Sequence, residues 1–214
     1  MRSTEALQQI GAGAGGGVAS TAEVARQLQL SGEAAAKVLA RLEADGLVRR
    51  VRRGLWLLNV AGDPRAVAAH LTAPYPAYIS RWSALSEHGM LDQIPRAITA
   101  VSLDRAQTIQ TMVGRFEISH IQPELYGGAV DDPRGFALAS PEKALFDLVY
   151  LQMIQGSRHV SLVEVEPGWG FSVEAVREWC RRVPQQRLRT QLALHLERVV
   201  SEMGLRWGSG RGLG

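Results

Sequence analysis

The feature that most constrains this chain is a close succession of helix start and stop signals near its N-terminus. Ser20 is a favourable N-cap, and Glu23 stands three residues later, which is the spacing of a capping box. These residues predict a helix over residues 21–30. Ser31 can then cap a second helix, and Gly46 suits the position just beyond the end of that helix. The sequence therefore predicts two helices separated by only a tight turn.

The second of these helices, predicted over residues 32–45, has two contrasting faces. Apolar residues recur at the i, i+3, i+4, i+7 spacing of a buried helical face. They are Ala35, Val38, Leu39 and Leu42. The opposite face holds Glu33, Ala36, Lys37, Ala40 and, at its edge, Arg41. A helix that reads DNA enters a groove ~12 Å wide, and small side chains on its outer face allow close approach to the bases.

The stretch LVRRVRRGLWLL, residues 47–58, follows this helix. Two short apolar-rich runs around Gly54 indicate a β-hairpin, with the arginines gathered toward the turn. The side chains expected to face the core are Leu47, Val51, Leu55, Trp56 and Leu57. Two helices joined by a short turn and followed by a hairpin predict a winged helix-turn-helix, with the hairpin as its wing.

Positive charge is concentrated in the same region. Residues 1–58 contain eight cationic and five anionic residues, a net charge of +3 that equals the net charge of the whole chain. This asymmetry suggests an anionic partner for the N-terminal part. Wing arginines next to a helix-turn-helix would contact phosphates, and one could enter the minor groove. Glu33 would either cap the helix or accept a hydrogen bond from a cytosine amino group. The predicted DNA-binding residues are Ser31, Glu33, Lys37, Arg41, Arg49, Arg50, Arg52 and Arg53.

A glycine run at residues 11–17, GAGAGGG, contains the pattern G-x-G-x-x-G of dinucleotide-binding loops. That motif needs a strand before it and a helix that opens on its last glycine. Here a short polar helix, predicted over residues 4–10, precedes the run, and no Lys-Ser/Thr pair of a P-loop is present. We interpret the run as a flexible connector between helices.

The remainder of the chain predicts a second domain. Residues 59–63 have the character of a linker, and Asp63 with Pro64 can begin a new helix. Helical patterns follow at residues 64–71, 78–90, 141–154, 172–182 and 185–203, and strand patterns at residues 94–103 and 114–121. The helix over 141–154 is predicted to be amphipathic, with Ser140 as its N-cap.

The predicted fold class is therefore α+β. We expect a winged helix-turn-helix domain over residues 1–60 and a mixed α/β domain with a helical end over residues 61–205. Residues 206–214 are expected to form a disordered tail, because the segment is rich in glycine and serine.

The composition argues against several classes of function. The single cysteine, Cys180, excludes an internal disulfide framework and a cysteine-based zinc site. No apolar run approaches the ~18 residues of a membrane span, and the N-terminus lacks the apolar core of a signal peptide, so a cytoplasmic location is expected. His88, Asp92, His120 and Asp147 form no recognisable set of nucleophile, base and orienting group. We expect no enzymatic activity, no cofactor and no metal site.

Two sequence segments in the second domain resemble those of a known family. They are YISRWSALSEHGMLDQIPRAITAV, residues 78–101, and ASPEKALFDLVYL, residues 139–151. Together with the helix-turn-helix and RRVRRGLWLL, they resemble the AbiE-type (AbiEi-like) antitoxins of type IV toxin–antitoxin systems. The resemblance covers about residues 20–155, and residues 156–214 match only loosely, as a helical end. The glycine run at 11–17 departs from the family pattern.

The resemblance implies a function that the residue spacing alone does not. In this family a winged helix-turn-helix binds inverted repeats in the promoter of the antitoxin–toxin operon and represses it. The C-terminal domain counters a nucleotidyltransferase-like toxin, and in some members its basic surface assists DNA binding. The expected partners are thus double-stranded DNA and such a toxin. Two alternatives remain: a stand-alone regulator whose C-terminal domain senses a ligand or dimerises, and an enzyme with a DNA-binding appendage.

Overall fold

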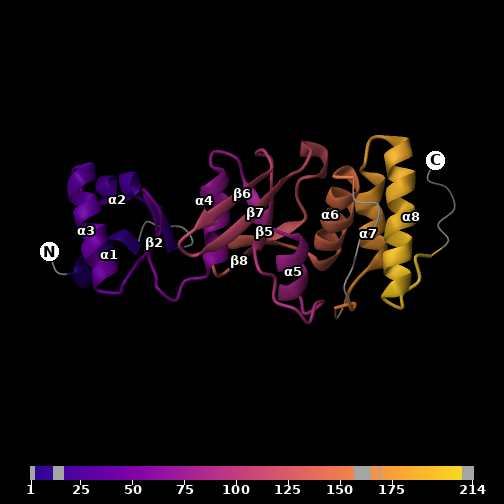
Figure 1. The fold of residues 1–214 in the computed structure, drawn as a ribbon, viewed down its shortest axis with the longest axis horizontal. Helices are drawn as coiled ribbons and strands as arrows, with labels where there is room; N and C mark the ends of the chain where they lie inside the picture. The colour runs from indigo at the N-terminus through magenta and orange to yellow at the C-terminus, as the bar shows by residue number, and fades with distance from the viewer. Residues whose placement is uncertain (1–2, 12–16, 157–164, 169, 209–214) are drawn as a thin grey trace.

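The computed structural model describes residues 3–11, 17–156, 165–168 and 170–208. Along the long axis of the molecule, a small N-terminal group of helices and strands is followed by a larger sheet and then by the C-terminal helices (Figure 1). The fold is of the α+β class, as predicted. Residues 12–16 of the predicted connector and residues 209–214 of the predicted disordered tail lie outside the described residues.

The elements up to Leu58, here called the N-terminal unit, combine helices with a small sheet. They are α1 (Ser3–Gly11), β1 (Val18–Ser20), α2 (Thr21–Gln27), α3 (Gly32–Ala44), β2 (Arg49–Arg52) and β3 (Leu55–Leu57). The strands form an antiparallel sheet in the order β1-β3-β2. The helices and the hairpin were predicted. Strand β1 was not, because its three residues are too few to show an alternating pattern.

The predicted helix signals are confirmed at the level of individual hydrogen bonds. The Glu23 amide donates to the Ser20 hydroxyl at 3.1 Å, and the Ser20 amide donates to the Glu23 carboxylate at 2.6 Å, which completes the capping box. The Ser31 hydroxyl accepts from the Ala34 amide at 3.2 Å. Gly46 has a φ of 68°, the left-handed conformation that ends a helix at low cost for glycine. Helix α2 ends three residues earlier than predicted.

The elements from Pro64 onward, here called the second unit, surround a six-stranded sheet. They are η2 (Pro64–Val67), α4 (Ala68–Thr72), β4 (Ala77–Ile79), α5 (Arg81–Glu87), β5 (Ile98–Ser102), β6 (Gln107–Thr111), β7 (Gly114–His120), η3 (Pro123–Leu125), β8 (Ala129–Asp132), β9 (Phe136–Ala139), α6 (Pro141–Ile154), α7 (Val173–Arg181) and α8 (Gln186–Glu202). The strand order is β6-β7-β5-β4-β9-β8, and the sheet is mixed because β4 runs parallel to β9 and β5 parallel to β7.

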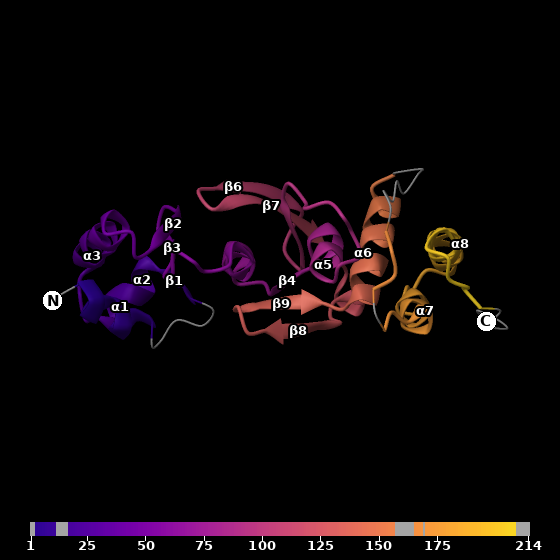
Figure 2. The same ribbon diagram turned by 90° about the horizontal axis from the view of Figure 1, so that it is seen from below.

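Two sequence predictions for the second unit were wrong. The helix predicted over residues 78–90 begins only at Arg81, because Tyr78 and Ile79 belong to β4, where Ile79 lies between Ala100 and Leu138. Helix α6 is not amphipathic, because every residue from 143 to 151 is buried. Figure 2 shows the reason: α6 lies between the sheet on one side and α7 with α8 on the other.

The sheet of the N-terminal unit is covered on both faces. Ala19 and Trp56 pack with α2 and α3 in one hydrophobic cluster. Val18, Val51, Leu55 and Leu57 belong instead to the large cluster of the second unit. Successive residues of a strand point to opposite faces, so β1 and β3 contribute to both clusters. Apolar packing therefore continues across the boundary predicted at residues 60–61.

A buried ion pair lies inside α6. The Lys143 ammonium contacts the Asp147 carboxylate one turn away, and both side chains are 0% exposed. Asp147 also accepts hydrogen bonds from the hydroxyls of Tyr78, at 3.0 Å, and Ser80, at 2.7 Å. Burial raises the pKa of Asp147 and lowers the pKa of Lys143, and the attraction between the two groups opposes both shifts. The pair joins α6 to β4 and to the start of α5.

Replacing Lys143 by methionine should destabilise the protein by about 3–5 kcal/mol, because a buried carboxylate then loses its partner. The measurement is the free energy of unfolding in urea. The double variant Lys143→Met, Asp147→Asn should be more stable than the single one, because it removes the unpaired charge.

The exposed pair of Glu33 and Lys37 provides a matched control, since it has the same i, i+4 spacing. Replacing Lys37 by methionine should change the unfolding free energy by about 0.5 kcal/mol or less. Equal losses for Lys143→Met and Lys37→Met would contradict the structural role of the buried pair.

Candidate nucleic-acid interface

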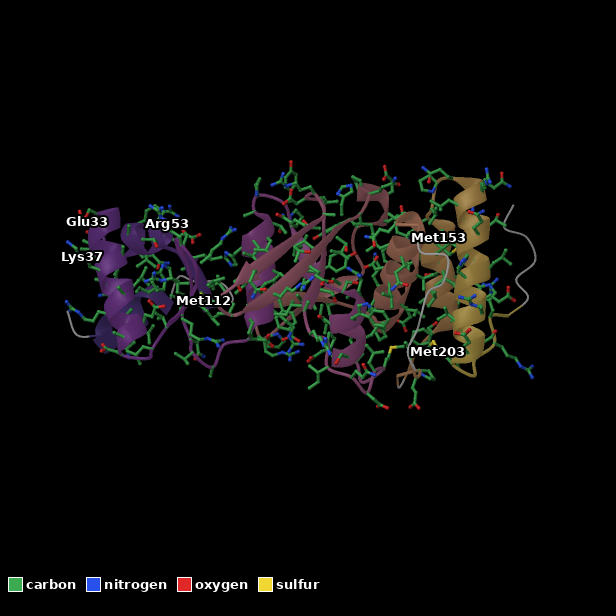
Figure 3. The ribbon with its side chains drawn as sticks, viewed as in Figure 1. Glu33, Lys37, Arg53, Met112, Met153 and Met203 are labelled. Carbon is green, nitrogen blue, oxygen red and sulfur yellow. The ribbon has the colours of Figure 1, made fainter. Side chains whose placement is uncertain are left out.

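Helix α3 presents one face to the core and one to solvent, as its sequence predicted. Ala35, Leu39 and Leu42 are buried. The outer residues Glu33, Ala36, Lys37, Ala40 and Arg41 are all exposed. Figure 3 shows Glu33 and Lys37 on the outer side of α3, away from the second unit. The two alanines leave this face without bulky side chains, so the helix can approach a groove closely.

The charged groups near the start of α3 are paired with each other. Lys37 lies 2.7 Å from the Glu33 carboxylate, and the two side chains are 74% and 80% exposed. A pair this exposed contributes little to stability. A phosphate or a base acceptor can therefore replace Glu33 as the partner of Lys37 at small cost, and a base amino group can replace Lys37 as the partner of Glu33. Ser31, the third candidate in this region, uses its hydroxyl to cap α3.

The hairpin of β2 and β3, here called the arginine hairpin, turns at Arg53 and Gly54. Gly54 has a φ of 80°, which favours glycine at this position. Its carbonyl oxygen accepts a hydrogen bond at 2.9 Å from the amide of Thr21, the first residue of α2. Arg52 and Arg53 are exposed, and within the described part of the chain neither forms an ion pair. These two guanidinium groups are available to an external anion.

Of the other two arginines of the hairpin, Arg50 makes contacts within the protein and Arg49 is half-buried. Arg50 contacts Glu43 at 2.9 Å, and its guanidinium lies 4.7 Å from the centre of the Trp56 ring. Trp56 in turn donates to the Thr21 hydroxyl at 2.9 Å. Arg49 is half-buried, and its Nε has no hydrogen-bond partner among the described residues. The structure thus distinguishes exposed Arg52 and Arg53, which form no ion pair among the described residues, from Arg50, which is exposed but paired, and from half-buried Arg49.

The structure adds Arg26 to the candidate surface. Arg26 is an exposed cation in the last turn of α2. Helix α2 starts beside Gly54 of the hairpin turn and leads into the start of α3 at Gly32, so Arg26 lies between the two predicted DNA-binding segments. The sequence carried a signal for it, because Arg26 is the only cation between Glu23 and Ser31.

Each of three residues considered for catalysis, His88, His120 and Asp147, contacts a group outside that set. The Nε2 atom of His88 lies 2.8 Å from the Ala139 carbonyl oxygen, and Nδ1 of His120 lies 3.0 Å from the Asp104 carbonyl oxygen. Cys180 is buried, and burial raises the pKa of its thiol to about 11, so it is a poor nucleophile. Asp147 forms a buried ion pair with Lys143.

Within the residues that the structure places, no three His, Cys, Asp or Glu side chains are grouped so that they could hold a metal ion. Among the helices of the described ranges, none has the length and apolar character of a membrane span.

No family model matches the chain, and no curated protein matches it.

Replacing Arg50 by alanine should lower the free energy of unfolding by about 1 kcal/mol, because the side chain loses both Glu43 and the Trp56 ring. Replacing Arg53 by alanine should change it by about 0.5 kcal/mol or less, because this exposed side chain has no ion-pair partner among the residues that the structure describes. Thermal unfolding of the two variants, measured side by side, checks the assignment. A larger loss for Arg53→Ala than for Arg50→Ala would contradict it.

Proposed function

We propose that the N-terminal unit is a winged helix-turn-helix domain that binds double-stranded DNA, and that the protein is a cytoplasmic transcriptional repressor. Helix α3 enters the major groove, and the arginine hairpin is the wing that lies along the phosphate backbone. One observation carries the proposal: the alanine-lined outer face of α3 is exposed on the same small unit as two arginines at a hairpin turn that form no ion pair with any described residue.

The first turns of α3 are assigned to reading the bases. When DNA displaces the exposed ion pair, Lys37 can donate to O6 and N7 of a guanine, and Glu33 can accept from a cytosine amino group. Ala36 and Ala40 provide the close approach that these short contacts require. Arg41 lies further along the same face, where it can reach a phosphate.

The cations around α3 are assigned to the phosphate backbone. Arg52 and Arg53 extend from the hairpin, and Arg26 lies on α2 between the hairpin and α3. Contacts of this kind set the position of the protein on DNA without reading sequence, and their strength depends on salt. Arg50 has a supporting role, because its contacts with Glu43 and Trp56 hold β2 against the helices.

Replacing both Arg52 and Arg53 by alanine should weaken binding to every DNA sequence. The slope of log K against log salt concentration should fall by about 1 for each phosphate contact that is lost. Fluorescence titrations of a labelled duplex at several salt concentrations measure both quantities.

Arg105→Ala is the matched control for this experiment. Arg105 is an exposed arginine in the loop between β5 and β6, so the variant removes a cation outside the proposed interface. Its salt slope should equal that of the unmodified protein. If the slope of the Arg52, Arg53 variant is also unchanged, the hairpin is not a DNA-binding wing.

The biological setting of the proposal comes from the resemblance to AbiE-type antitoxins. We propose that the protein represses its own operon at an inverted repeat and counters a nucleotidyltransferase-like toxin through the second unit. The segment at residues 139–151 contains Ser140, Lys143 and Asp147, which form the cap and the buried pair of α6. These residues shape the core of the second unit, so a toxin would contact other positions.

Co-expression tests the antitoxin role. A neighbouring gene that arrests growth when expressed alone should become harmless when this protein is co-expressed. A variant lacking Arg52 and Arg53 should still protect the cells, because in this proposal protection resides in the second unit. The readout is the growth of cells that carry both genes under separate promoters. A neighbour that is harmless alone, or toxic and not rescued, contradicts the antitoxin role and leaves the repressor proposal intact.

One observation favours a regulator that senses a ligand instead. The second unit contains a cleft of about 470 Å³ lined by Trp82, Leu91, Ile94, Glu117 and neighbouring side chains. Apolar walls with a few charged groups are typical of small-molecule sites. In that alternative the N-terminal unit would keep its DNA-binding role, and the second unit would respond to a ligand in place of a toxin.

A further inference from the structure

Strand β2, which carries the arginines, contains a β-bulge at Val51. Arg50 lies opposite Trp56 and Arg52 lies opposite Leu55, so Val51 has no partner residue in the ladder. A bulge frees the backbone groups of the extra residue and changes the direction of the strand. The Val51 side chain is 0% exposed and belongs to the hydrophobic cluster of the second unit. The bulge therefore turns one residue of the arginine hairpin toward the second unit.

The carbonyl group of Val51 finds its hydrogen-bond partner in the second unit. Its oxygen accepts a hydrogen bond from the Met112 amide, with an N···O distance of 3.0 Å. Met112 lies in the turn between β6 and β7, and the hairpin of these strands extends toward the N-terminal unit (Figures 2 and 3). Met112 is 80% exposed, and it makes this contact through its backbone amide and not through its side chain. Val113 beside it packs against the same cluster as Val51.

The position of this contact gives it a functional consequence. Val51 stands between Arg50 and Arg52, and Arg53 follows at the turn. A hydrogen bond to its carbonyl and the packing of its side chain together restrict the orientation of β2 relative to the second unit. The directions in which Arg52 and Arg53 leave the strand are restricted with it. A fixed orientation lowers the entropy cost of placing both arginines on phosphates.

We propose that Met112 is a positioning residue for the arginine hairpin. Through the hydrogen bond from the Met112 amide to Val51, the second unit raises the affinity of the hairpin for DNA without contacting the DNA itself. The inference rests on the proposed DNA-binding function. It gives the β6–β7 turn a role in DNA binding, although the exposed, uncharged side chain of Met112 does not indicate one.

Met112→Pro in the full-length chain removes the contact selectively. Proline has no amide N–H, so Val51 loses its donor. The hairpin itself should tolerate the change, because its ladder ends at Thr111 and Gly114 and does not use the Met112 amide. The φ of Met112 is not positive, and Thr111 before it is in extended strand conformation, as proline requires. Met112→Ala is the matched control, because it removes the side chain and keeps the N–H.

Met112→Pro should bind a DNA duplex about fivefold more weakly, the factor that corresponds to one net hydrogen bond. Its salt slope should also be smaller, because poorly oriented arginines make fewer phosphate contacts. Met112→Ala should match the unmodified protein in both. If the proline variant binds as tightly as the alanine variant with the same slope, the inference is wrong while the proposed function stands. If the unmodified protein shows no salt-dependent DNA binding, the proposed function itself fails.

Hydrogen exchange of the Met112 amide tests the same coupling without a substitution. Coupling between two events is reciprocal, so a contact that strengthens DNA binding must itself be strengthened by DNA. Saturating DNA should slow exchange at the Met112 amide by about the same fivefold factor, as measured by NMR. The Ile109 amide, in the strand that leads to this turn, serves as the internal reference. Equal exchange at Met112 with and without DNA would overturn the inference, even if the proline variant did not fold.

Discussion

The small sheet of the N-terminal unit has to satisfy two hydrophobic cores at once, and the arrangement of the molecule depends on this constraint. Trp56 faces the helices, whereas Leu55 and Leu57 beside it face the second unit. A fully buried Leu or Trp contributes roughly 1.5–3 kcal/mol, so neither side can be given up cheaply. The helices and the second unit are therefore held at fixed places on opposite faces of one layer. The hairpin turn and the outer face of α3 remain exposed in this arrangement.

Local signals made much of the N-terminal unit predictable. A capping box, a second serine cap and a glycine stop act over three or four residues, so the sequence alone placed the starts of α2 and α3 and the end of α3 correctly to within a residue. The end of α2, which has no such stop signal, was predicted three residues too late. The outer face of α3 was predicted from the helical spacing of its apolar residues, and all the candidate residues on that face are exposed. The caps at Asp63 and Ser140 were predicted for the same reason, since each side chain accepts from an amide two or three residues away.

The features that the sequence did not reveal depend on distant parts of the chain. The stacking of Arg50 on Trp56 requires β2 and β3 to pair with a bulge, and no local pattern marks that bulge. Tyr78 and Ile79 lie at the apolar start of a helical pattern, but strands from residues 98–102 and 136–139 draw them into the sheet. The burial of α6 on all sides depends on α7 and α8, which arrive later in the chain. In each case tertiary packing decided between conformations that the local sequence allows.

The single cysteine gives the native chain a built-in reporter. Cys180 is 1% exposed on α7, and its thiol donates weakly to the Arg189 carbonyl of α8 at 3.6 Å. A thiol reagent can reach it only after the packing around α7 opens, and the chain contains no second thiol that would add to the signal. The rate of labelling therefore measures how often the packing around α7 opens. Such labelling would show whether a protein partner of the second unit holds that packing closed.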